Sequence, residues 1–224
     1  VEENSKLEII PNDWNNLQKS DIIIQHDIGS DGITDYTEEF TSKSQTEEFS
    51  LNLSPGWSLF STPVTLDPAN STLNKIFDQD AQQHIEVILG WDGNQWFIPD
   101  FDYQLQPLHA IAIKTDESVT ATLMPSSEIS APSSRILSEG INLVGCAPAC
   151  TGGSFQPMLV NEAFRCIETS DVGTGYVMVI SPAWNQPGWA CVRGGTPKDL
   201  LPYKGYWVVM ENDDTLYGFS TTPV

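Results

Sequence analysis

The feature that most constrains this chain is an ordered series of sequence matches between its first and second halves. Residues 53–59 (LSPGWSL) match residues 137–143 (LSEGINL), residues 91–96 (WDGNQW) match residues 184–189 (WNQPGW), and residues 107–113 (PLHAIAI) match residues 202–208 (PYKGYWV). The offset is 84 between positions 56 and 140, 93 between positions 91 and 184, and 95 between positions 107 and 202. Because the matches keep their order, they indicate a tandem duplication. Such duplication is typical of surface modules and unusual for catalytic sites.

The 224 residues are predicted to form two homologous modules behind an N-terminal extension. The extension or domain remnant covers residues 1–48, the first module 49–130 and the second 131–224, and a Pro- and Ser-rich linker over residues 125–134 joins the modules. Each module reads as a strand bent at a glycine, a short helix, a hairpin, a proline-led strand and a closing strand. The predicted fold class is mainly β, with two β-sandwich or barrel-like modules that each carry one short helix.

Charge narrows the classes of partner. The chain has 30 acidic and 10 basic residues, and its net charge is −20. A field of this sign repels nucleic-acid phosphates and anionic lipid headgroups, so we expect no nucleic-acid partner. No apolar run of about 18 residues occurs, so we expect no membrane insertion. The acidity suits a cation-rich exterior, and the alternative is a solvated acidic surface that meets no partner.

The cysteines are confined to the second module: Cys146, Cys150, Cys166 and Cys191. An even count in one module predicts two disulfides, and three pairings are open. Zinc is the alternative, but the spacing contains no Cys-x2-Cys knuckle. Residue 1 is Val rather than Met and no signal peptide is visible, which fits a processed exported chain or a trimmed one. Asn52 and Asn70 begin predicted N-glycosylation sequons.

The N-terminal extension contains two strand-like segments. Residues 6–10 alternate polar and apolar side chains, and residues 21–26 read as a more buried strand. The extension is too short to be expected to fold as a stable domain, so we expect Leu7, Ile9 and Ile10 to contribute to assembly with other subunits. An unattached strand of this kind can complete the sheet edge of a neighbouring subunit.

The strongest metal-binding motif is the acidic segment of residues 27–38 (DIGSDGITDYTE). It resembles a twelve-residue calcium loop, with Asp27, Asp31, Asp35 and Glu38 as oxygen ligands and the carbonyl of Ile33 at the seventh position. Position three is Gly29, so one carboxylate is missing. A plain β-turn closed by residues 31–32 is the alternative. Calcium is the only cofactor that the sequence suggests, and we expect no organic cofactor.

The repeated tryptophans carry the second candidate site: Trp91, Trp96, Trp184 and Trp189. Exposed indole rings could stack on sugars, but each Trp-x4-Trp pair flanks a hairpin turn, where core packing and cross-strand contact are the favoured interpretation. The three histidines show no metal-protease spacing, and neither a nucleophile elbow nor a P-loop occurs. We therefore expect no enzyme.

A family resemblance rests on residues 53–64 (LSPGWSLFSTPV), on the tryptophans at 91 and 96, and on residues 205–208 (GYWV). This pattern resembles a repeat module of archaeal cell-surface proteins, especially those of methanogens. Those repeats open with a Leu-x-x-Gly-Trp-Asn-Leu-Ile-Ser-x-Pro-like strand and close with Gly-Tyr-Trp-Val. The first copy departs with Ser58, and the second with Ile141. The resemblance covers residues 49–224 and implies an extracellular, adhesive or assembly role, without implying a reaction.

These observations together predict an extracellular structural protein at the cell surface. The expected role is a self-assembling subunit of an archaeal envelope layer (an S-layer), sheath or filament, with other copies or other surface proteins as partners. The alternative is an adhesin or glycan-binding module of a larger secreted protein. An accessory region of a secreted hydrolase is the third interpretation.

Overall fold

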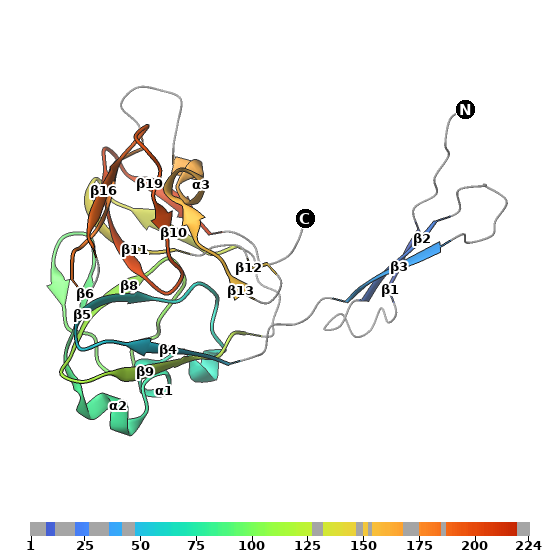
Figure 1. The fold of residues 1–224 in the computed structure, drawn as a ribbon. Helices are drawn as coiled ribbons and strands as arrows, with labels where there is room; N and C mark the ends of the chain where they lie inside the picture. The colour runs from blue at the N-terminus through green and yellow to red at the C-terminus, as the bar shows by residue number, and fades with distance from the viewer. Residues whose placement is uncertain are drawn as a thin grey trace. The chain divides into compact units, whose positions relative to one another are not determined.

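The computed structural model describes residues 8–11, 21–26, 36–41, 48–126, 132–146, 150–151, 154–167, 175–184 and 187–218. Contacts divide the chain into two units, Val1–Gln45 and Thr46–Val224. Both units are built from antiparallel β-strands, and the helices of the second unit are short (Figure 1). The mainly β fold class is therefore confirmed.

The first unit holds a three-stranded antiparallel sheet. Its strands are β1 (Glu8–Pro11), β2 (Asp21–His26) and β3 (Tyr36–Thr41), in the order β1-β2-β3. The expectation of an unattached N-terminal strand is wrong, because Ile9 and Ile10 lie in β1 opposite Ile24 and Ile23 of β2. The two strands are close in sequence, so the entropy cost of closing the loop between them is small. Leu7 lies outside the described residues.

The second unit begins with a four-stranded sheet and a separate strand pair. The strands are β4 (Phe49–Leu53), β5 (Gly56–Ser61), β6 (Ile85–Trp91), β7 (Trp96–Phe97), β8 (Ala110–Thr115) and β9 (Val119–Leu123). The sheet has the order β5-β8-β6-β7, and β4 pairs with β9. Between β5 and β6 lie η2 (Pro68–Asn70), α1 (Leu73–Ile76) and α2 (Gln79–Gln83), where one short helix was expected. Asp78 caps α2 by accepting a hydrogen bond from the Ala81 amide.

The remaining strands repeat this layout. They are β10 (Ser134–Leu137), β11 (Gly140–Gly145), β15 (Tyr176–Ser181), β16 (Trp189–Val192), β18 (Gly205–Met210) and β19 (Asp214–Tyr217). The additional elements are β12 (Cys150–Thr151), β13 (Ser154–Phe155), β14 (Met158–Leu159), α3 (Val160–Ala163), η3 (Arg165–Ile167) and β17 (Asp199–Leu200). The sheet order β11-β18-β15-β16 and the pair β10-β19 reproduce the first arrangement strand for strand.

We call residues 48–126 the first half and residues 132–218 the second half of this unit. Their strand orders are the same, while common ancestry and the predicted module boundaries remain predictions from the sequence. Contacts keep both halves within one compact unit. In Figure 1, α1 and α2 lie beside β9 in the first half, and in the second half α3 contacts β14 and β17.

Each half has its own hydrophobic core, and a third cluster lies between the two sheets. The first core includes Phe60, Phe77 and Ile111, and the second includes Tyr176 and Tyr206. The cluster between the sheets contains Leu59, Ala110, Ala112 and Leu143, with partly buried tryptophans packed against it. Each sheet therefore uses one face for its own core and the other face for its partner sheet.

The two halves are joined by reciprocal backbone contacts. The Ser61 amide donates to the Tyr203 carbonyl at 2.9 Å, and the Gly145 amide donates to the Leu108 carbonyl at 3.0 Å. Positions 61 and 145 are offset by 84, and positions 108 and 203 by 95, which are the offsets of the sequence matches. The second bond is thus the counterpart of the first with the halves exchanged, as across a local twofold axis.

The turn residues of this junction have an unusual backbone conformation. Leu108 has φ 64° and Tyr203 has φ 66°, and no other non-glycine residue in the described part of the chain has positive φ. A left-handed conformation costs roughly 1–2 kcal/mol in a non-glycine residue, so the junction must compensate for it. Leu108 compensates by packing in the core of the second half, and Tyr203 packs against the core of the first.

Candidate functional site

The candidate site consists of two groups of tryptophan rings, and each group draws its rings from both halves. We define the tryptophan surface as Trp57, Trp91, Trp96, Trp184 and Trp207. The first three lie on or beside β5, β6 and β7, Trp207 lies on β18, and Trp184 follows β15. Neither half alone supplies the surface.

Small residues bring the two sheets together beside this surface. A Cβ atom on Gly205 would lie 2.6 Å from the Cβ atom of Ala110, and one on Gly145 would lie 2.6 Å from the Cβ atom of Ser61. Real Cβ atoms do not approach so closely, so these positions tolerate only glycine without a shift of the sheets. Away from this point of close approach, tryptophan rings occupy the space between the sheets.

Three of these rings form a compact edge-to-face group. The ring centroids of Trp91 and Trp96 are 5.4 Å apart, those of Trp91 and Trp207 are 6.0 Å apart, and those of Trp96 and Trp207 are 5.5 Å apart. Their interplanar angles are 71°, 81° and 87°. Aromatic quadrupoles favour this arrangement over parallel stacking. The indole N–H of Trp91 donates to the Ile141 carbonyl at 2.8 Å, which fixes the group across the junction.

A second contact repeats the first with the halves exchanged. The ring centroids of Trp57 and Trp184 are 5.6 Å apart, with an angle of 43°. Trp57 and Ile141 are offset by 84 and open equivalent strands. The hairpin tip of each half therefore reaches the start of the equivalent strand in the other half.

Part of the tryptophan surface is open to solvent. Trp96 is 45% exposed and Trp184 is 38% exposed, while the other three tryptophans are half-buried. Ile141, whose carbonyl accepts the Trp91 hydrogen bond, is 51% exposed, and Ile98, two residues after Trp96, is 82% exposed. Monomeric proteins expose few contiguous apolar patches, and large ones mark interaction sites.

The structure confirms one predicted tryptophan pair and corrects the other. Trp91 and Trp96 lie directly opposite each other in the β6–β7 hairpin. Trp189 faces Ser181 instead of Trp184, because β15 ends three residues before Trp184. It stacks on Tyr206 at 5.6 Å, against the second core and outside the tryptophan surface.

Sequence reasoning missed two members of the surface. Trp57 and Trp207 lie within the matched segments LSPGWSL and PYKGYWV, so the repeat itself carried the signal. The sequence could not show that the strands of Trp57 and Trp207 belong to two sheets that pack on each other. Sequence matches predict the order of the strands, but they do not predict how one sheet packs on another.

The junction beside the surface carries two half-buried basic side chains, Arg135 and His109. The Arg135 guanidinium donates to the carbonyls of Leu108 and Leu143, at 2.9 Å and 2.5 Å, and burial lowers its pKa to about 10. His109 lies in a β-bridge to Val144, and burial followed by the nearby Arg135 charge lowers its pKa. The junction therefore holds the neutral form of His109 preferentially.

The predicted disulfides are not formed. Cys146, Cys166 and Cys191 are free thiols, and the side chain of Cys150 lies outside the described part. Cys146 is buried in the second core, which raises the pKa of its thiol to about 12. The Cys191 thiol donates to the Thr196 carbonyl at 3.5 Å, and the exposed Cys166 accepts a hydrogen bond from the Tyr217 amide. The hydrogen-bond partners of Cys166 and Cys191 are therefore backbone groups.

The predicted calcium loop falls mostly outside the described residues. Asp27, Asp31, Ile33 and Asp35 lie in the segment between β2 and β3, and Glu38 lies in β3 opposite Ile24. Within the described ranges, no group of three or more His, Cys, Asp or Glu side chains could hold a metal ion.

The two predicted glycosylation sites differ in how their amides are held. Asn52 is exposed on β4, and its side-chain oxygen accepts a hydrogen bond from Thr120 at 2.9 Å. Asn70 is half-buried, and its amide nitrogen donates to Asp67 at 3.4 Å. The attachment nitrogen of Asn52 is therefore the more accessible of the two.

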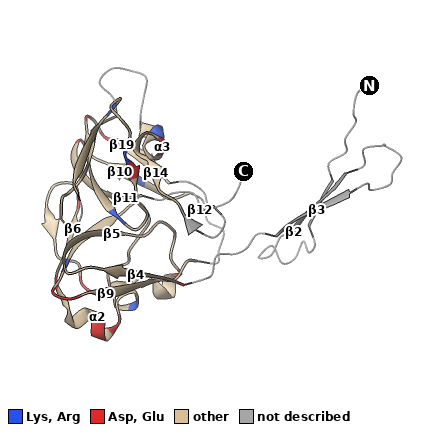
Figure 2. Cartoon of the chain, in the orientation of Figure 1, with Lys and Arg blue, Asp and Glu red and all other residues tan. Residues whose placement is uncertain are grey.

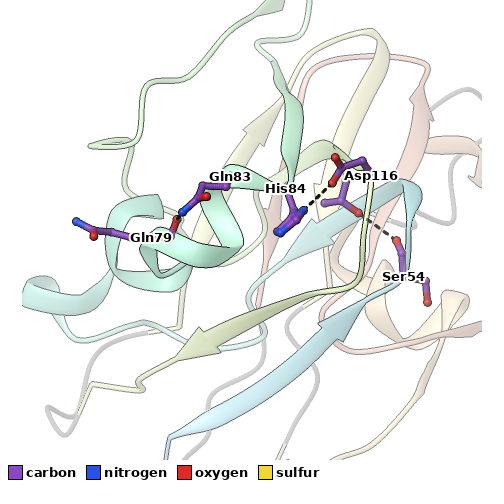
Figure 3. A network of polar contacts seen from close by, with 6 residues as sticks. Ser54, Gln79, Gln83, His84 and Asp116 are labelled. Atoms are coloured by element: carbon purple, nitrogen blue, oxygen red, sulfur yellow. Dashed lines mark hydrogen bonds and ion pairs between the residues drawn. The ribbon is translucent and has the colours of Figure 1, made fainter.

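Figure 3 shows polar contacts of His84 and neighbouring residues, which connect several elements of the first half. His84, at the end of α2, contacts Asp116 at 3.0 Å, and this hydrogen bond is the main cause that raises the pKa of His84. Beside it, Thr115 donates to the Ser54 carbonyl. These contacts join α2, β8 and the turn after β4, which is a structural role.

Neither charge nor cavities indicate another site in the described residues. Figure 2 shows the strands of the two sheets as largely uncharged, with acidic residues at α2. A cavity of ≈ 140 Å³ lies beside Cys191 and Tyr176, below the roughly 300–1,000 Å³ typical of ligand pockets. No helix of the described residues is both long and apolar enough to span a membrane.

Comparison with known proteins gives no independent evidence on the function of this site. No known protein family, curated protein or solved structure matches the chain. The resemblance to an archaeal surface repeat therefore rests on the sequence motifs, and the function rests on the geometry of the tryptophan surface.

Proposed function

We propose that this chain is an extracellular structural protein that self-associates, as a subunit of an archaeal envelope layer, sheath or filament. The observation that carries the proposal is the tryptophan surface, where Trp96 and Trp184 are exposed and the exposed Ile141 holds the Trp91 indole. Tryptophan is among the residues most enriched at the energetic centres of protein interfaces. A protein that exposes it together with isoleucine has a ready surface for another subunit.

The ring geometry favours protein association over sugar binding. A sugar platform presents the flat faces of its aromatic rings, whereas Trp91, Trp96 and Trp207 stand nearly perpendicular to one another. The indole N–H of Trp91 is already used by Ile141, so it offers no donor to a hydroxyl group. Shape complementarity to a second protein tolerates such a surface, because partner side chains can fill the spaces between the rings.

The joined halves suit a load-bearing subunit. Two cores, a cluster between the sheets and reciprocal hydrogen bonds link the first half to the second. Burial of this kind resists local opening, since low-stability segments are those with few buried contacts. A rigid body passes force between neighbours without first unfolding a module.

The proposed location is the cell exterior, and the proposed partners are other copies or other surface proteins. The net charge of −20 and the motif resemblance support this location. Free thiols remove the disulfide argument for export. Calcium in the loop of residues 27–38 remains part of the proposal, because Ca²⁺ prefers carboxylate and carbonyl oxygens.

The test is assembly of the purified chain at high concentration, observed by negative-stain electron microscopy with calcium and with EDTA. We expect regular sheets or filaments, and their loss in Trp96→Ser and in Trp184→Ser. Ile136→Ser is the matched control, because Ile136 is 75% exposed but lies on β10, outside the tryptophan surface. Monodisperse particles in every condition, or equal loss in the control, would contradict the proposal. Loss in EDTA alone would assign calcium to the assembly.

The second candidate is a glycan-binding adhesin, which the exposure of Trp184 favours. Among the rings of the described residues, Trp184 contacts Trp57 at a tilted angle of 43°, whereas each ring of the perpendicular group contacts two others. Specific retention on a glycan array, lost in Trp184→Ala while the circular dichroism spectrum is unchanged, would decide for this role.

A further inference from the structure

We propose that the junction between the halves can be formed by two copies of the chain, so that the first half of one copy docks on the second half of another. The partner is identified as a second copy of the chain, because each half carries the same two docking elements. The first element is an amide at the end of a strand, which donates a hydrogen bond to the other half. The second is a turn residue with positive φ, whose carbonyl accepts that bond and whose side chain packs into or against the core of the other half.

The first step concerns the hydrogen bonds. Ser61 and Gly145 provide the amides, and Tyr203 and Leu108 provide the carbonyls, always from opposite halves. The Ser61 hydroxyl adds a bond to the Lys204 carbonyl at 2.8 Å. Every one of these bonds is unchanged if the two halves belong to different copies.

The second step concerns the cores. Leu108 of the first half is 2% exposed and belongs to the core of the second half. Tyr203 of the second half packs against the first core, with its ring centroid 6.5 Å from that of Phe49. Isolated from the first half, the second half would lose the core side chain of Leu108, and the isolated first half would lose the cover that Tyr203 gives its core. Either half alone would also expose the cluster between the sheets, so each half needs a partner.

The third step concerns the covalent link. The described chain of the first half remains attached to it up to Ser126, whose amide donates to the Thr65 carbonyl. The second half is held in place from Ser133 onward, because the Ser133 carbonyl accepts a hydrogen bond from the Gly218 amide. One crossing through residues 127–131 therefore joins the halves. Exchange of an element between copies needs only that such a crossing lead to a different copy.

Because the contacts are the same, concentration decides which form appears. Within one chain the effective concentration of the partner half is high, so dilute refolding favours the monomer. Concentrated refolding lets a second copy compete and yields dimers, and open chains result when exchange does not close. The inference deepens the proposed assembly role and rests on it for its biological meaning, but it uses the junction instead of the exposed tryptophans.

The experiment uses the full chain with a protease site placed within residues 127–131. Isotopically heavy and light protein are mixed, unfolded in denaturant and refolded together at high concentration, and the dimer is isolated by gel filtration. Cleavage of the crossing should convert the dimer to monomer-sized particles, some with a heavy first half and a light second half by native mass spectrometry. A dimer formed by surface docking would keep its mass after cleavage.

The control is heavy and light monomer refolded separately at low concentration, cleaved and then mixed. Mixing of halves in this control would also support the inference, since halves would then find a partner from another copy without a covalent link. Absence of dimer after concentrated refolding, or a cleaved dimer that keeps its mass, would overturn it. Trp96→Ser should still form the exchanged dimer while losing sheets or filaments, which separates this inference from the proposed function.

Discussion

Replacing the junction residue Leu108 with Ala is expected to destabilise both halves of the Thr46–Val224 unit at once. Leu108 belongs to the first half by sequence but is buried in the core of the second. Independent modules would confine the damage to one of them. Interlocked halves should unfold in a single transition, because neither core is complete without the other half.

The magnitude follows from the burial of the side chain. Leu108 is 2% exposed, so the substitution removes three buried carbon atoms, worth roughly 0.8 kcal/mol each. The cavity left behind adds to this loss and brings the expected cost to about 3–4 kcal/mol. Alanine keeps the same left-handed backbone strain, so the difference reports the lost side chain and not a relaxed turn.

The assay is urea unfolding combined with hydrogen exchange measured by mass spectrometry. With a slope of roughly 2 kcal/mol per molar urea, the midpoint should fall by about 1.5–2 M. Protection should fall equally for the amides of β8 and β18, which lie in the central positions of the two sheets. Ile98→Ala is the matched control, because Ile98 is 82% exposed and its truncation should change stability by less than about 0.5 kcal/mol.

Two results would refute this reasoning. Loss of protection confined to the second half would show that its core is damaged while the first half stays folded. Two separate transitions in the wild-type protein would show that the halves are independent modules joined by a linker. Either result would also weaken the inference that the halves need each other.

Four further predictions follow from single positions. Leu108→Gly should be more stable than Leu108→Ala by about 1 kcal/mol in urea unfolding, because glycine relieves the positive φ. Gly205→Ala should cost about 1–3 kcal/mol in the same assay, since its new methyl group would lie 2.6 Å from Ala110. Burial lowers the pKa of His109, so its contribution to stability is full above the unfolded pKa of about 6.5 and is lost as pH falls through the folded pKa. His109→Gln should remove this acid-side loss, and a variant with an unchanged pH profile would contradict the assignment. Alkylation of the native protein followed by mass spectrometry should modify Cys166 readily and spare Cys146, whose burial raises its thiol pKa to about 12.

Much of the fold could be predicted because its signals are local. Asp92-Gly93 marks a hairpin turn, and the structure closes β6 and β7 there with Trp91 opposite Trp96. Gly56 and Gly140, at matched positions, both adopt positive φ where their strands begin, at 99° and 93°. Matched short motifs therefore predicted matched strands, and the two sheets have the same order.

The errors arose where distant residues decide the outcome. Cysteine counting predicted disulfides, but whether Cys146 meets another thiol depends on the packing of the second core. The match of Trp184 with Trp91 predicted cross-strand contact between Trp184 and Trp189, whereas β15 ends at Ser181 and this residue lies opposite Trp189. Trp57 and Trp207 joined the candidate site only when one sheet was placed on the other, because cross-sheet contacts leave no periodic pattern in either strand.

The contacts between the two halves also explain how the tryptophan rings keep fixed positions although part of their surface is exposed to solvent. Trp91 is held by the Ile141 carbonyl, and Trp207 packs against the cluster between the sheets, so these rings are positioned before any partner arrives. A partner therefore orders few additional side chains, which lowers the entropy cost of association. Each junction contact draws one residue from each half, so loss of the junction would also separate Trp91 from Trp207. Stability of the unit and the shape of its candidate interface consequently depend on the same residues, and a variant that opens the junction should lose assembly even with every exposed tryptophan intact.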